Sequence, residues 1–383
     1  MTSEGIKRTR VIELDLLRAL AIIMVVIGHL TAYLAVPQLM TFSVLAASSF
    51  LLLFGLAQFF FLSGFVLQYN YGSTVTKDLG TFFKKRLVRI YPLYWLSIIT
   101  AFLLLTRHIG NEYILSRSDL LISLSGLQAI LSPRFVDPIF TNWFVGVILI
   151  LYLLFPLLMY LSNKGMNIIT ASFLILLPLI ALRVAFDLVD FRFFLYYGIF
   201  VAGILACRYD VMHRHRPQLR FLCVSAVLFA PLYAYIGIIF APQLVYAAAY
   251  GLLWNTNILT YPYLPGTAPP VTVTLLLAIT LNLLMLLFIY FVSIAARLSA
   301  HTMRKMTRNL LLAIAFSSYA LYLFEEQVFD VGHAILHEVL YLTSVQIDVA
   351  MVVLVVPILF VFAYWLQTEE NKVIKRIRSR RAT

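Results

Sequence analysis

Long apolar runs alternate with short polar segments along the whole chain. The hydrocarbon core of a bilayer is about 30 Å thick, so a helix needs about 20 consecutive apolar residues to cross it. The pattern therefore predicts an all-α fold, a polytopic membrane helix bundle with about ten transmembrane helices. The predicted spans are approximately 12–34, 43–69, 90–106, 140–162, 168–186, 192–207, 219–240, 271–297, 311–329 and 346–367.

Two further segments are apolar but do not fit a full span. Residues 243–266 are interrupted by Asn255 and Asn257 and end in a segment rich in proline and tyrosine, so we expect a re-entrant or outer-surface segment. In the largest predicted outer loop, the apolar side chains of residues 119–131 favour an interfacial helix.

The basic residues predict the orientation of the bundle. Cytoplasmic loops of membrane proteins carry an excess of Lys and Arg. With ten spans and both termini in the cytoplasm, most of the 29 Lys and Arg residues fall on the cytoplasmic side. A full span at 243–266 would move the basic cluster at 208–220, or the one at 297–308, to the outside. We therefore expect ten spans with cytoplasmic N and C termini.

The composition excludes several classes of protein. Only 12% of the residues are charged and 62% are hydrophobic, whereas a soluble domain carries about 25% charged residues. The expected surroundings are therefore a lipid bilayer. In a soluble protein the net charge of +12 would suggest nucleic acid, but here the orientation rule accounts for it, and no nucleic-acid partner is expected. Two cysteines, Cys207 and Cys223, are too few for a disulfide framework or a zinc site, and we expect no metal.

The first span is expected to remain in the protein. It follows three basic residues, as a signal peptide does, but its apolar run is longer than a signal-peptide core and contains Arg18 and His29. Residues 1–383 are therefore expected to form a single multi-pass membrane domain. The sequence leaves a homo-oligomer open.

Charged and polar residues at membrane depth are the main functional candidates, because each buried charge costs about 2.5–3.5 kcal/mol on insertion scales. Arg18 and His29 lie eleven residues apart. On a helix this spacing places both on one face, with His29 about 16 Å further along the axis. Asp15 precedes Arg18 by one turn and is placed to pair with it. The alternative is that Arg18 extends to the headgroups and His29 makes one interhelical hydrogen bond.

Two adjacent carboxylates, Glu325 and Glu326, lie near the outer end of the ninth predicted span. That depth is similar to the depth of His29. Neighbouring residues on a helix point about 100° apart, so at most one carboxylate is expected to face His29. The alternative is that both acids are exposed at the headgroup level.

Four cations, Lys84, Lys85, Arg86 and Arg89, are expected in the loop at the inner mouth of the third span. They fit a phosphate site and a set of positive-inside anchors equally well. In the second span, Ser63 precedes a glycine, and tight helix packing is the slightly better interpretation of this pair.

Together these residues resemble the acyltransferase 3 family of integral membrane acyltransferases. The matching motifs run in family order from the first to the ninth span: Leu14-Asp15-x-x-Arg18 followed by His29, the F-F-x-S-G-F stretch from Phe60 to Phe65, Arg86-Leu-Val-Arg89-Ile-Tyr-Pro92, Trp143 through Tyr152 to Pro156, and Ser318-Tyr319-Ala320-Leu321-Tyr322-Leu323. The resemblance therefore covers essentially the whole chain.

The resemblance implies an enzyme that takes an acyl group, commonly acetyl, from a cytoplasmic acyl-CoA and places it on a hydroxyl of a cell-envelope glycan. It implies that Arg18 and His29 are essential and that Arg86 and Arg89 belong to a conserved cytoplasmic motif. It also implies a location in the plasma or inner membrane. The chain departs from many members at two positions, because Ile148 replaces a glutamate and Glu325 replaces a histidine.

The expected mechanism assigns a role to each candidate. Neutral His29 acts as general base on the acceptor hydroxyl, because imidazole titrates close to working pH, and Glu325 orients and stabilises it. Arg18 holds the donor or the pocket, in a cavity that it shares with His29. The acyl-CoA, acetyl-CoA or another, is expected to bind at Lys85, Arg86, Arg89 and Ser63, and the glycan acceptor at Asp15, Asn142, Trp143 and Tyr322.

Other mechanisms and functions stay open on the residues alone. A covalent acyl-enzyme at Ser63 is chemically allowed, but the sequence identifies no base for it. A transporter or flippase for a glycan or a lipid-linked intermediate would also bury charges, yet it predicts inverted repeats that the sequence does not show. A scaffold subunit would leave the alignment of Arg18 and His29 unused.

Overall fold

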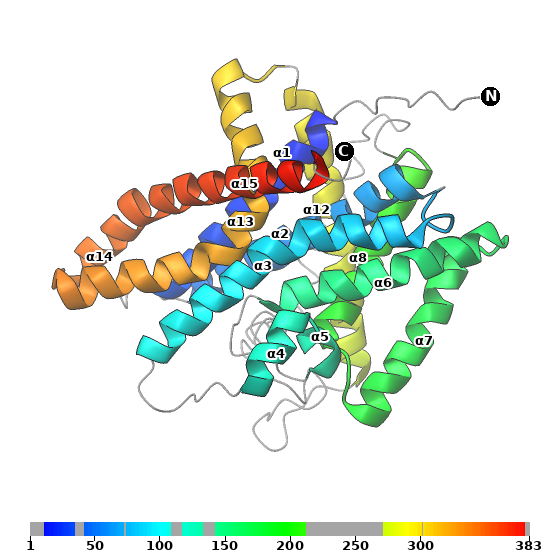
Figure 1. Ribbon diagram of the computed structural model, residues 1–383. Coiled ribbons are helices and arrows are strands. Elements are labelled where there is room, and N and C mark those ends of the chain that lie inside the picture. Colours follow the sequence, from blue (N-terminus) through cyan, green and yellow to red (C-terminus); the bar gives the residue numbers. More distant parts are fainter. Residues whose placement is uncertain are drawn as a thin grey trace.

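The computed structural model describes residues 11–34, 42–72, 74–108, 117–132, 142–211, 271–300 and 302–379. Within these ranges the regular structure is helical, which confirms the all-α prediction (Figure 1). The helices are α1 (Ile12–Leu30), α2 (Phe42–Tyr71), α3 (Leu79–His108), α4 (Arg117–Ser125), α5 (Gln128–Leu131), α6 (Trp143–Asn163), α7 (Ile168–Phe186), α8 (Phe191–Arg208), α12 (Val271–Ala300), α13 (Lys305–Ala334), α14 (Ser344–Ala350) and α15 (Val356–Ser379).

Eight helical segments in the described ranges are long and apolar enough to cross a membrane, so the chain is a multi-pass membrane protein. They coincide with eight of the ten predicted spans: Ile12–Tyr33, Phe50–Tyr71, Leu79–Leu104, Trp143–Asn163, Ile168–Phe186, Ile279–Ala300, Lys305–Val339 and Ser344–Arg376. The prediction at 192–207 corresponds to α8, an 18-residue helix that is not among the eight. The predictions at 219–240 and 243–266 lie outside the described residues.

Two predicted helix boundaries were wrong. Helix α3 begins at Leu79 and not at 90, so the basic cluster lies on the helix and not in a loop. The carboxylate of Asp78 accepts a hydrogen bond from the Thr81 backbone N–H (3.0 Å), which caps the helix at that point. Hydrogen bonds from the Thr81 side chain and backbone lower the pKa of Asp78. The predicted helix at 119–131 is two short helices, α4 and α5, because the chain turns between them at Gly126 (φ +79°).

Helices α2 and α8 cross closely, and a glycine on each makes the crossing possible. A Cβ atom on Gly64 would lie 2.0 Å from the Phe200 carbonyl oxygen, and one on Gly203 would lie 2.1 Å from the Phe61 carbonyl oxygen. In lipid the close approach of backbones replaces the hydrophobic effect as the main source of helix association. The predicted tight packing beside Ser63 is therefore confirmed.

Cross-helix contacts fix the relative directions of the helices that form the site. Helices α1 and α13 run parallel, since His29 contacts Glu325 and Tyr33 contacts Asp330. Helix α15 runs antiparallel beside α13 (Figure 1), since Phe316 contacts Tyr364 and Phe324 contacts Phe362. We call the end of the bundle at which α1 begins the Arg18 end, and the opposite one the His29 end.

The contacts between helices place seven helix termini at the Arg18 end. Helices α1, α3 and α13 begin at the Arg18 end, and α2, α8 and α15 end there, as their pairings show. Helix α12 also ends there, because Ala296 and Ala300 pack against Leu16. Helices α8 and α12 therefore run in the same direction, as the predicted topology has them. Which end faces the cytoplasm stays a prediction.

Candidate active site

A cavity of about 300 Å³ lies at the Arg18 end between α1, α2, α3, α6 and α13. It brings together six of the predicted site residues, which come from α1, α2, α3 and α13. Its lining consists of Asp15, Arg18, Phe59, Ser63, Arg86, Arg89, Ile90, Phe144, Val145, Ile148, Tyr152, Ala315, Phe316, Ser318, Tyr319 and Tyr322. Along α6 the lining runs from Tyr152 to Phe144, eight residues or about 12 Å of helix.

Three arginines line this cavity, and aromatic rings hold one of them. The guanidinium carbon of Arg86 lies 4.9 Å from the ring centroid of Tyr71, 5.6 Å from that of Tyr152 and 5.9 Å from that of Phe82. Such contacts attract a cation to the ring faces without neutralising its charge. The Arg86 Nε atom is buried and has no hydrogen-bond partner. The site therefore presents a cation without a neighbouring carboxylate among the described contacts.

The predicted pair of Arg18 and Asp15 is present. Arg18 Nη1 lies 3.4 Å from Asp15 Oδ1, and the two side chains are 33% and 13% exposed. Both line the cavity, as does Ser63 from α2. Arg18 is therefore part of an internal site. The alternative, in which its side chain only extends to the lipid headgroups, does not explain this position. Lys85 is exposed and does not line this cavity.

His29 meets one of the two adjacent carboxylates near the opposite end of α1. His29 Nδ1 and Glu325 Oε1 are 2.7 Å apart, and the Glu325 side chain is fully buried. This rules out the alternative in which both acids are exposed. The second oxygen of Glu325 is buried without a hydrogen-bond partner. The sequence predicted that at most one carboxylate would face His29 and assigned this role to Glu325; the packing of α13 against α1 brings Glu325 to that position.

The turn of α1 that carries His29 is fixed by hydroxyl groups and by a close helix contact. The Gly28 carbonyl accepts hydrogen bonds from Thr31 Oγ1 (2.7 Å) and Ser48 Oγ (2.8 Å). A Cβ on Gly28 would lie 2.6 Å from Leu52 Cγ, so the glycine lets α2 approach. One turn further, the Tyr33 hydroxyl donates to Asp330 Oδ1 (2.9 Å). These contacts hold the imidazole against α13.

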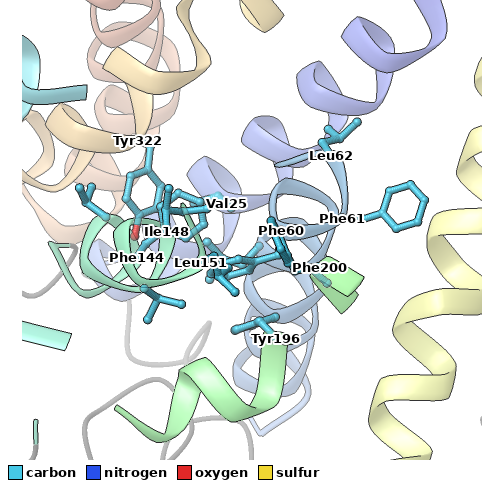
Figure 2. Packing of buried hydrophobic residues seen from close by; sticks show 14 of the residues in the cluster. Val25, Phe60, Phe61, Leu62, Phe144, Ile148, Leu151, Tyr196, Phe200 and Tyr322 are labelled. Carbon is cyan, nitrogen blue, oxygen red and sulfur yellow. The ribbon is translucent and has the colours of Figure 1, made fainter. Parts of the chain in front are cut away.

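The cavity and the pair of His29 and Glu325 are separate, which corrects the expectation of a shared cavity. The lining ends at Phe144 and Tyr322, whose ring centroids are 4.7 Å apart, and includes neither His29 nor Glu325. Figure 2 shows these two rings within the buried cluster that also contains Val25, a residue of α1 between Arg18 and His29. The two rings separate the cavity from the His29–Glu325 pair by a short distance, because Tyr322 precedes Glu325 by three residues, about 4.5 Å along α13.

The remaining predicted acceptor residues lie beside the cavity and not in it. Trp143 is buried, and the guanidinium of Arg192 lies 4.3 Å from its ring centroid. Asn142 is fully buried, and neither polar atom of its side chain has a hydrogen-bond partner. Their roles stay predictions. Asp190 pairs with Arg192 at 2.5 Å, a contact for which the sequence alone gave no signal.

Sequence reasoning missed the aromatic character of the cavity wall. Tyr152 and Tyr319 both line it, but the sequence singled them out only as parts of the family motifs. A stripe of cavity-lining residues at 144, 148 and 152 recurs every four residues, a spacing that is indistinguishable from ordinary core packing. Ile148 makes that part of the wall apolar.

The fold and the site define a multi-pass membrane protein with an arginine-lined cavity and a buried histidine–carboxylate pair. A family model described as an acyltransferase domain matches residues 11–368, nearly the whole chain. The chain therefore belongs to the acyltransferase 3 family and is a membrane acyltransferase. Searches of curated proteins and of solved structures found no significant match.

Proposed function

We propose that the protein transfers an acyl group, acetyl in the simplest case, from a cytoplasmic acyl-CoA to a hydroxyl of a cell-envelope glycan or lipid-linked saccharide. The observation that carries this proposal is the position of the arginine-lined cavity, which ends one helical turn short of a buried His–Glu pair. The proposal places the Arg18 end at the cytoplasmic face of the plasma or inner membrane.

The chemistry of the cavity suits the donor. Acyl-CoA joins a polyanionic nucleotide to a long neutral arm that ends in a thioester. Arginine binds phosphate through charge-assisted, often bidentate hydrogen bonds, and Arg86 and Arg89 lie where α3 enters the bundle. The arm then extends along α6 past Ser63 toward Phe144. Arg18, still balanced by Asp15, faces the same cavity.

The acyl group must pass the rings of Phe144 and Tyr322 to reach His29. In the proposal these side chains turn aside when the donor is bound, and the thioester carbonyl then lies beside the imidazole. The acceptor hydroxyl attacks the carbonyl carbon while His29 takes its proton. The carbon–sulfur bond breaks, and the leaving CoA thiolate receives the proton from the imidazolium, which returns His29 to its neutral form. Glu325 stabilises the imidazolium through the 2.7 Å contact.

Transfer from labelled donor tests the function directly. Full-length protein in detergent is supplied with acetyl-CoA carrying a radiolabelled acetyl group and with a panel of saccharide acceptors. Protein-dependent appearance of label in a saccharide supports the proposal. Absence of transfer, together with saccharide movement across liposomes in the absence of any CoA compound, would instead support the flippase.

Arg86→Gln is expected to raise the KM for acetyl-CoA about 10- to 100-fold, because hydrogen bonds to charged groups contribute about 1.5–3 kcal/mol. The kcat should change little, since Arg86 lies far along the cavity from the reacting atoms. Steady-state kinetics with varied acetyl-CoA measure both. Lys84→Gln removes the same charge from an exposed position of α3 and serves as the matched control. Equal effects of the two substitutions would contradict a specific role for Arg86.

A further inference from the structure

A buried carboxylate on α15 lies beside the donor cavity without lining it. Glu370 is 5% exposed. Its Oε2 atom accepts a hydrogen bond from Gln367 and lies 3.7 Å from Arg89 Nη1, while its Oε1 atom is buried without a hydrogen-bond partner. An ionised carboxylate loses several kcal/mol of hydration when it is buried. The nearby guanidinium offsets part of this cost.

Glu370 pairs with one residue that lines the cavity, Arg89. The Arg89 side chain is 45% exposed, and Nη1 also donates to the Asn371 side-chain oxygen at 2.7 Å. Two consecutive residues of α15 therefore engage the same nitrogen of Arg89. Helix α15 contributes no residue to the described lining of the cavity, but it contacts the lining residues Arg89, through polar groups, and Phe316, through the ring of Tyr364.

The two arginines of the α3 motif are thus held by different means. Arg86 lies over aromatic rings of α2, α3 and α6, whereas polar groups of α15 hold Arg89. A half-exposed arginine near the end of a membrane helix is otherwise free to extend toward water or headgroups. A guanidinium carries five N–H donors. The contacts with α15 use Nη1, so the proposal assigns the donors of Nη2 and Nε to an anion.

We propose that Glu370 is a positioning residue for the donor, which holds the Arg89 guanidinium at the cavity so that it meets a phosphate of acyl-CoA. This inference rests on the proposed function and extends it to the last helix of the chain. Glu370 does not touch the reacting atoms. Its effect is therefore confined to the binding of donors that carry phosphates.

The test compares two donors in the full-length protein. Glu370→Gln keeps the size of the side chain and removes its charge. We expect the KM for acetyl-CoA to rise about tenfold with kcat unchanged within about twofold. The kcat/KM for acetyl-pantetheine, which lacks phosphates, should stay at the wild-type value. A purely structural loss would lower the activity with both donors.

A double substitution tests whether Glu370 acts through Arg89. If it does, Arg89→Gln combined with Glu370→Gln should raise the KM for acetyl-CoA no further than Arg89→Gln alone. Glu369→Gln is the matched control, because Glu369 is the preceding residue, is 43% exposed and pairs with Lys372 at 2.7 Å on the outside of α15. It should match the wild type with both donors.

Each outcome decides between the claims. Equal losses with both donors, additive effects in the double variant, or wild-type kinetics of Glu370→Gln would overturn the positioning role and leave the acyltransferase function intact. A wild-type protein that transfers acetyl from neither donor would overturn both. If Glu370→Gln yields no folded protein, Glu370→Asp replaces it, since the shorter side chain keeps its charge and should show the same donor-selective rise in KM.

Discussion

His29→Gln is expected to lower the kcat of acyl transfer by about 10²- to 10⁴-fold, the usual contribution of a general base. Glutamine cannot accept the proton of the acceptor hydroxyl at neutral pH. Its amide can still donate a hydrogen bond toward Glu325, which lies 2.7 Å from His29 Nδ1 in the wild type. The substitution therefore removes the base and leaves the buried carboxylate with a partner. Single-turnover transfer from labelled acetyl-CoA measures the effect.

The control is the folded state of the variant. His29→Ala would leave the fully buried Glu325 without its partner, and removal of one member of a buried pair costs about 3–5 kcal/mol. Loss of activity in the alanine variant would therefore not distinguish a missing base from a misfolded protein. Loss of activity in the glutamine variant, with an unchanged melting profile, would identify the missing base. Wild-type turnover in folded His29→Gln would show that another group takes the proton.

Gly64→Leu is expected to abolish accumulation of folded protein. Even a Cβ at this position would lie 2.0 Å from the Phe200 carbonyl oxygen, and a backbone atom cannot turn aside as a side chain can. Overpacking of a core costs about 1–3 kcal/mol and sometimes more, and here α2 and α8 would have to separate. The thermal unfolding of protein in detergent and the yield of monodisperse protein measure the loss.

Gly80→Leu is the matched control for this experiment. Gly80 also lies in a helix, but a Cβ there would meet nothing closer than 3.9 Å, the Asp78 carboxylate oxygen. The control should accumulate like the wild type. Gly203→Leu should resemble Gly64→Leu, because its Cβ would lie 2.1 Å from the Phe61 carbonyl oxygen on the other side of the same crossing. Normal stability of Gly64→Leu would show that the two helices do not depend on this close approach.

The candidate site was predictable from the sequence as far as single helices determine it. The eleven-residue spacing of Arg18 and His29 fixes one helix face, and the pairing with Asp15 follows from one turn of the same helix. The sequence identified the basic motif of α3 but placed it in a loop and not on the helix. Hydropathy marks where a helix enters lipid, whereas α3 begins eleven residues earlier at a capped, polar turn.

Other features of the site depend on which helices meet. The sequence by itself determined the all-α membrane fold, most of the spans and the residues that share the face of α1, because helical periodicity and bilayer thickness are local constraints. The tertiary structure established the expected contact of Glu325 with His29, and it alone decided that the cavity ends at Phe144 and Tyr322 and that Glu370 pairs with Arg89. These contacts join residues hundreds of positions apart. In lipid these contacts depend on how closely the helix surfaces pack. Apolar runs of nearly uniform composition do not reveal which of their residues will touch another helix.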